Sequence, residues 1–160
     1  MPPILRFDHA SPYLTYVNPV LNPTGPFTVG HATSVNISIQ NTGSETGNAN
    51  VHLFWIGPMQ CASAGPMMDL VNGNKLSPPY GASHPIMFSV LPGVGGKATV
   101  SWTPSAADFP KTLGPTVPGC LFAQIEVLPN PPTYPGDPSA LTNWSPIYQL
   151  CAQHNIHIGT

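Results

Sequence analysis

Charge is what this sequence has least of. Only 6% of its 160 residues are charged, four of them basic and six acidic, and the formal net charge is −2. Proteins that bind nucleic acids or anionic membrane surfaces do so through clustered Lys and Arg side chains. Four scattered cations form no such cluster, so the composition predicts neither nucleic-acid binding nor electrostatic attachment to a membrane.

Long helices and long apolar runs are missing as well. The chain contains 22 Pro and 15 Gly residues, which interrupt every candidate helix and leave no run of about 18 apolar residues that would predict a transmembrane helix. The opening residues MPPILRFDHASPYL lack the basic and apolar regions of a secretory signal. We therefore expect a soluble protein, while the sequence leaves its compartment open.

Alternation with a period of two is the clearest positive signal. Val35, Ile37 and Ile39 alternate with polar residues, as in a half-buried strand. Segments 32–41 and 50–55 flank a polar turn and are predicted to form a hairpin, and a Gly-rich turn separates the strands at 84–91 and 97–104. Further strands are expected at 14–20, where Pro19 suggests an edge position, and at 119–128 and 147–158.

About seven short strands without a three-turn helix predict an all-β fold, an immunoglobulin-like antiparallel β-sandwich. We expect one domain over residues 1–160, in which 1–30 form a Pro-rich arm with the first strand and 32–158 form the sandwich. The two long loops, at about 57–83 and 129–145, are the places where binding is expected on such a scaffold.

Five segments, in order, resemble the CARDB modules, a cell-adhesion-related family of bacterial immunoglobulin-like domains. They are VNISIQNTG (35–43), NVHLFW (50–55), WTP (102–104), CLFAQIE (120–126) and AQHNI (152–156). The resemblance implies a β-sandwich that acts as a spacer, an adhesive unit or an accessory domain. It implies no catalytic activity.

The residues themselves give no pattern for catalysis, a metal or a cofactor. The Gly-rich segment 93–98 lacks the first Gly and the hydroxyl of a phosphate loop, and no helix follows it. His154 and His157 point to opposite faces of a strand, and the other histidines lie in separate elements. The chain contains no Ser elbow and no H-E-x-x-H motif, so we expect a protein that is not an enzyme.

Cys120 and Cys151 fall on the last two predicted strands, which are neighbours in an immunoglobulin-like sheet. Two buried thiols and a cross-strand disulfide are both compatible with this placement, and buried thiols are favoured. Three Cys residues in total leave at least one thiol unpaired in either case.

The leading hypothesis is a non-enzymatic structural or interaction module that self-assembles or decorates a larger bacterial or viral particle. One alternative is a carbohydrate-recognition module that stacks sugars on Trp144, Tyr134 and Tyr148 of the second long loop. Another is an accessory subunit that holds an enzyme partner through Met67 and Met68 of the first loop, whose side chains offer an adaptable apolar surface.

Overall fold

The computed structural model describes residues 5–6, 21–23, 25–57, 67–73, 75–76, 84–125 and 151–160. The predicted strand at 14–20, the loop at 129–145 and most of the loop at 57–83 lie outside these residues. The strands predicted from 32 onward are all present. Their observed bounds are given below.

One sheet has four strands. Its centre is β4 (Thr33–Asn41), which pairs with β9 (Gly96–Trp102) and also with β1 (Leu5–Arg6) and β2 (Leu21–Pro23). All of these pairings are antiparallel. The β4–β9 register is continuous from Thr33 opposite Trp102 to Ile39 opposite Gly96, so no bulge interrupts it.

The other sheet has seven strands, in the order β3, β11, β10, β5, β6, β7, with β8 also paired to β5. Every pairing is antiparallel except the short parallel pair of β3 with β11. The strands are β3 (Phe27–Thr28), β5 (Gly47–Ile56), β6 (Met67–Asp69), β7 (Lys75–Leu76), β8 (Ile86–Val90), β10 (Thr116–Ile125) and β11 (Cys151–Gly159). The helical element in the described part is a single 3₁₀ turn, η1 (Lys111–Leu113).

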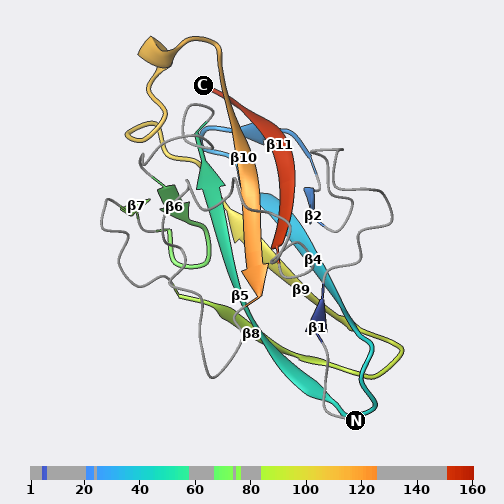
Figure 1. Ribbon diagram of the computed structural model, residues 1–160. Coiled ribbons are helices and arrows are strands. Elements are labelled where there is room, and N and C mark those ends of the chain that lie inside the picture. The colour runs from blue at the N-terminus through green and yellow to red at the C-terminus, as the bar shows by residue number, and fades with distance from the viewer. Residues whose placement is uncertain are drawn as a thin grey trace.

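In Figure 1 the four-stranded sheet with β4 and β9 lies behind β5 and β10 of the seven-stranded sheet. Buried side chains from both sheets form one hydrophobic core. The predicted inward face of β4 is confirmed, since Val35, Ile37 and Ile39 are at most 2% exposed. Trp55 and Trp102 meet at Phe109, whose ring centroid lies 4.9 Å and 5.9 Å from theirs in edge-to-face contacts. The prediction of an all-β, immunoglobulin-like sandwich is therefore confirmed.

The predicted hairpin of 32–41 with 50–55 is wrong. β4 and β5 belong to different sheets, and residues 42–46 cross from one to the other. β8 and β9 also separate: β8 pairs with β5 and β9 pairs with β4. The two stay in contact where they leave their turn, at the Leu91–Gly95 bridge and at Gly96, which lies against the Ser89 carbonyl of β8. Alternation shows that a segment is a strand with one buried face. It does not show which strand pairs with it, because two successive strands alternate in the same way in a hairpin and in a crossover between sheets.

Candidate functional site

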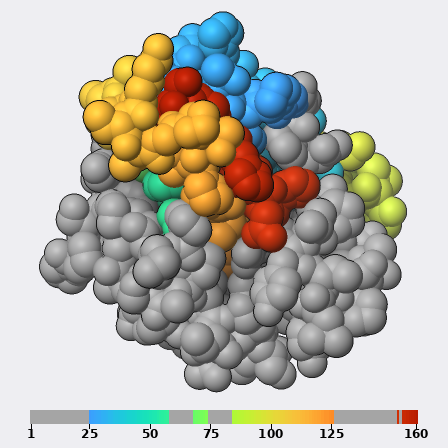
Figure 2. Space-filling view, turned by 90° about the horizontal axis from the view of Figure 1, so that it is seen from above, coloured from blue at the N-terminus to red at the C-terminus, as the bar shows by residue number. Residues whose placement is uncertain are grey.

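Exposed apolar side chains concentrate on β8 and in the turn that follows it. Of the four large apolar side chains exposed in the described residues, three lie here: Met87 is 73% exposed, Leu91 47% and Val94 82%. We call these three residues the exposed apolar trio. No Asp, Glu, Lys or Arg occurs from 84 to 96. In Figure 2 the yellow-green atoms of this segment lie at one side of the molecule.

The alternation along β8 explains why apolar residues reach the surface. Val90 is buried, and Ile86 and Phe88 are half-buried against the core. Met87, Ser89 and Leu91 therefore share the opposite, outward face. The Ser89 hydroxyl donates a hydrogen bond to Asn48 Oδ1 at 3.3 Å on the neighbouring strand, so this face carries a polar pair between Met87 and Leu91.

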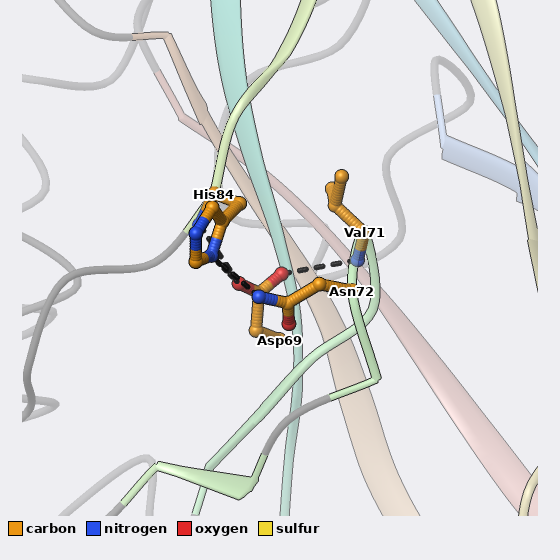
Figure 3. Close-up of polar contacts among 4 residues, drawn as sticks. All are labelled: Asp69, Val71, Asn72 and His84. Atoms are coloured by element: carbon orange, nitrogen blue, oxygen red, sulfur yellow. Dashed lines mark hydrogen bonds and ion pairs between the residues drawn. The ribbon is translucent and has the colours of Figure 1, made fainter.

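A buried carboxylate fixes the start of β8. Asp69 is fully buried, and its Oδ1 accepts the Val71 backbone N–H at 3.0 Å while Oδ2 accepts that of His84 at 2.8 Å. The His84 ring contacts the Asn72 amide, and its Nδ1 lies 3.9 Å from Asp69 Oδ2 (Figure 3). Hydrogen bonds to an ionised group are among the stronger ones, so Asp69 joins the turn after β6 firmly to the residues before β8.

A buried amide fixes the other end of β8. Asn41 is 3% exposed, and its Nδ2 donates to the Val90 carbonyl at 3.0 Å and to the Glu45 carbonyl at 2.7 Å. Its Oδ1 accepts the Gly43 N–H at 2.9 Å, and its backbone carbonyl accepts the Gly93 N–H at 3.2 Å. The N-x-G step of the sequence motif is thus a structural tie between the 42–46 crossover and the end of β8.

The turn between β8 and β9 is tightly constrained. Leu91 and Gly95 exchange two backbone hydrogen bonds of 3.2 and 2.9 Å. Gly95 has φ +86°, and a Cβ on it would lie 2.6 Å from the Ile39 carbonyl oxygen. Only glycine fits here without displacement of the backbone. The exposed apolar trio is therefore carried by a segment that is held at both ends and closed by a fixed turn.

Most of the ligand-binding residues proposed from the sequence are not described. Trp144, Tyr134 and Tyr148 lie outside the described residues. Met67 lies in β6 opposite Ile56, and its side chain is outside the description. The prediction that Met68 lies on the surface is wrong. Its side chain is 4% exposed and belongs to the core cluster, because it lies on the inward face of the short strand β6.

Cys120 is buried and forms no disulfide. In the β10–β11 ladder it lies opposite Asn155, whereas Cys151 lies opposite Gln124. Four positions along a strand correspond to about 13 Å, about twice the Cα separation that a disulfide spans. The disulfide alternative does not fit this register.

Within the described ranges, no three His, Cys, Asp or Glu side chains gather closely enough to hold a metal ion. His154 is half-buried and His157 exposed, on different faces of β11. No helix in the described part of the chain is long and apolar enough to cross a membrane.

The sequence reasoning missed Asp69, Asn41 and the exposed apolar trio. In the sequence, Asp69 has the same context as an ordinary exposed acidic residue of a long loop. Met87 lies in an apolar strand, so it has the same context as a core residue. One signal was present, since the segment 84–96 combines a predicted strand with a complete lack of charge. Edge strands are ordinarily protected by charged side chains.

No protein-family model matches the chain, and the curated proteins give no match to its sequence. Among solved structures it is similar to the CARDB domain of a Pyrococcus furiosus protein in complex with di-metal ions, at a TM-score of 0.47 and 11% identity, over 98% of this chain and 88% of that one. Two structures of a β-glucosidase from Listeria innocua, with glucose and with gluconolactone, show a TM-score of 0.35 and 12% and 11% identity over 88% of this chain and 16% of theirs. The family that the sequence motifs resemble is thus also the family of the first of these structures.

Proposed function

We propose that this chain is a non-catalytic structural module that works by binding a second copy of itself through the exposed apolar trio. The observation that carries the proposal is the concentration of exposed Met87, Leu91 and Val94 on one rigidly held, uncharged segment. Clustered apolar side chains on a soluble domain favour protein contacts. Because the segment is already ordered, association costs little conformational entropy.

A second copy is the partner that the charge distribution favours. A net charge of −2 over 160 residues gives two copies little mutual repulsion. The segment 84–96 has no charge that would select an oppositely charged partner. The carbohydrate alternative at Trp144, Tyr134 and Tyr148, and the enzyme-partner alternative, stay predictions from the sequence.

Light scattering coupled to size exclusion, over a hundredfold range of concentration, tests the proposal. The wild-type mass is expected to rise with concentration from 16.9 kDa toward twice that value. Met87→Lys combined with Val94→Lys should hold the protein at the monomer mass, because each cation would be buried in the contact.

The matched control adds the same two charges elsewhere, as Thr112→Lys combined with Leu113→Lys on η1, where Leu113 is 55% exposed. This control should associate like the wild type. A wild-type protein that stays monomeric throughout the range contradicts the proposed function.

A further inference from the structure

The strand β9 follows the exposed apolar trio directly and has a second edge that no described strand pairs with. Along one edge, all seven residues of β9 pair with β4. The preceding strand β8 lies in the other sheet, paired with β5, so it forms no ladder with the opposite edge. Its contact with β9 is at the first residue, Gly96, which lies against the Ser89 carbonyl. Lys97, Thr99 and Ser101 are exposed along the outer face.

This edge lacks the usual devices that prevent strands from pairing between molecules. Natural edge strands are blunted by bulges, prolines, several charges or short length. β9 contains no proline, its register with β4 is continuous, and Lys97 is its single charged residue. A regular seven-residue edge of this kind is a template for another strand.

We propose that two copies of the chain associate by antiparallel pairing of their β9 edges about a two-fold axis at Thr99, which joins the two four-stranded sheets. This rests on the proposed function and specifies its geometry. A two-fold axis requires self-complementary pairing, in which residues i and j of the two copies face each other in both directions. Centring the axis at Thr99 pairs all seven residues, from Gly96 opposite Trp102 onward.

The charges and the side-chain faces fit this register. Lys97 of each copy lies opposite Ser101 of the other, so the two lysines are about 13 Å apart along the strands. That distance exceeds the Debye length of about 8 Å at physiological salt, so their repulsion is screened. Ala98 lies opposite Val100, which continues the inward face across the junction. Val94, in the turn two residues before Gly96, is the member of the exposed apolar trio nearest to β9 in sequence.

Two substitutions on the same face of β9 test this register, because the proposed pairing predicts opposite changes of the dimer Kd for them. Ser101→Glu places a carboxylate opposite Lys97 of the other copy, twice per dimer, and should lower the dimer Kd by about 2- to 30-fold. Thr99→Glu places two carboxylates opposite each other at the axis and should raise the Kd. Both variants add the same charge to exposed positions of one strand. Thr99→Glu also removes the hydrogen bond that the Thr99 hydroxyl donates to Asn36 Oδ1 at 2.9 Å, so Thr99→Gln, which loses that bond without adding a charge, is its control.

Sedimentation equilibrium of the full chain gives each Kd. Opposite shifts of the two variants support β9 pairing, and both shifts should shrink at high salt. Equal shifts, or none, in a protein that still dimerises through the exposed apolar trio would overturn the β9 geometry and leave the proposed function standing. A wild-type protein without measurable dimer overturns both.

Discussion

Replacing Asp69 by Asn tests whether the buried carboxylate holds the start of β8. Both carboxylate oxygens accept a backbone N–H, at 3.0 Å from Val71 and 2.8 Å from His84. The amide of Asn keeps one acceptor and places an NH₂ donor against the other N–H. A buried donor left without a partner costs about 1–3 kcal/mol, and the loss of charge weakens the remaining bond.

Relief from burying a charge offsets part of this cost, because the facing His84 ring is a counter-charge only when it is protonated. We therefore expect Asp69→Asn to lower the free energy of unfolding by about 2 kcal/mol. Asp69→Ala should cost more, since it leaves both N–H groups without an acceptor.

Equilibrium urea unfolding followed by Trp fluorescence measures the effect, as a lower midpoint at unchanged m-value. Asp108→Asn is the matched control, because the Asp108 carboxylate accepts its hydrogen bond from the exposed Ser105 hydroxyl at 2.6 Å. The control should change stability by less than about 0.5 kcal/mol. A folded Asp69→Asn protein as stable as this control would refute the reasoning.

Three further substitutions have defined outcomes in the same unfolding assay. Asn41→Ala removes a fully hydrogen-bonded buried amide and should cost about 2–4 kcal/mol; retained stability would mean that the crossover is held by other contacts. Gly95→Ala should destabilise more than Gly93→Ala. Both residues have positive φ, but only at Gly95 would the added Cβ meet the β4 backbone, and equal losses would argue against that close approach. Gly119→Ala places a methyl group against the Trp55 indole nitrogen and should cost about 1–3 kcal/mol together with a change in Trp fluorescence, whereas an unaltered spectrum would contradict this packing.

The strands were predictable because their signal is local. Val35, Ile37 and Ile39 show by alternation alone which face of β4 is buried, and the structure confirms it. The pairing of the strands was not predictable in the same way. Asn41 selects the crossover by bonding to Val90, which is 49 residues away in sequence.

The candidate site was harder to predict because its exposed residues look like core residues. In the segment IMFSV, apolar residues occupy both faces, so periodicity does not show that Met87 points outward. The role of Asp69 depends on a hydrogen bond from the backbone of His84, 15 residues later in the chain. No local sequence pattern shows that these two residues are in contact. Chain composition carried the usable clue, through the lack of charge from 84 to 96.

The pairing of β8 with β5 links the two parts of the proposed interface. It turns Met87 outward, and it leaves the second edge of β9 without a partner among the described strands. Two buried polar residues hold the ends of β8: Asp69 bonds to the backbone of His84, just before the strand, and Asn41 bonds to that of Val90, its last residue. Moving β8 to the other sheet would break one of these contacts first. Buried polar contacts of this kind specify one arrangement when every partner is satisfied. The same contacts that fix the sheet assignment of β8 therefore leave the second edge of β9 unpaired among the described strands, as the proposed dimer requires.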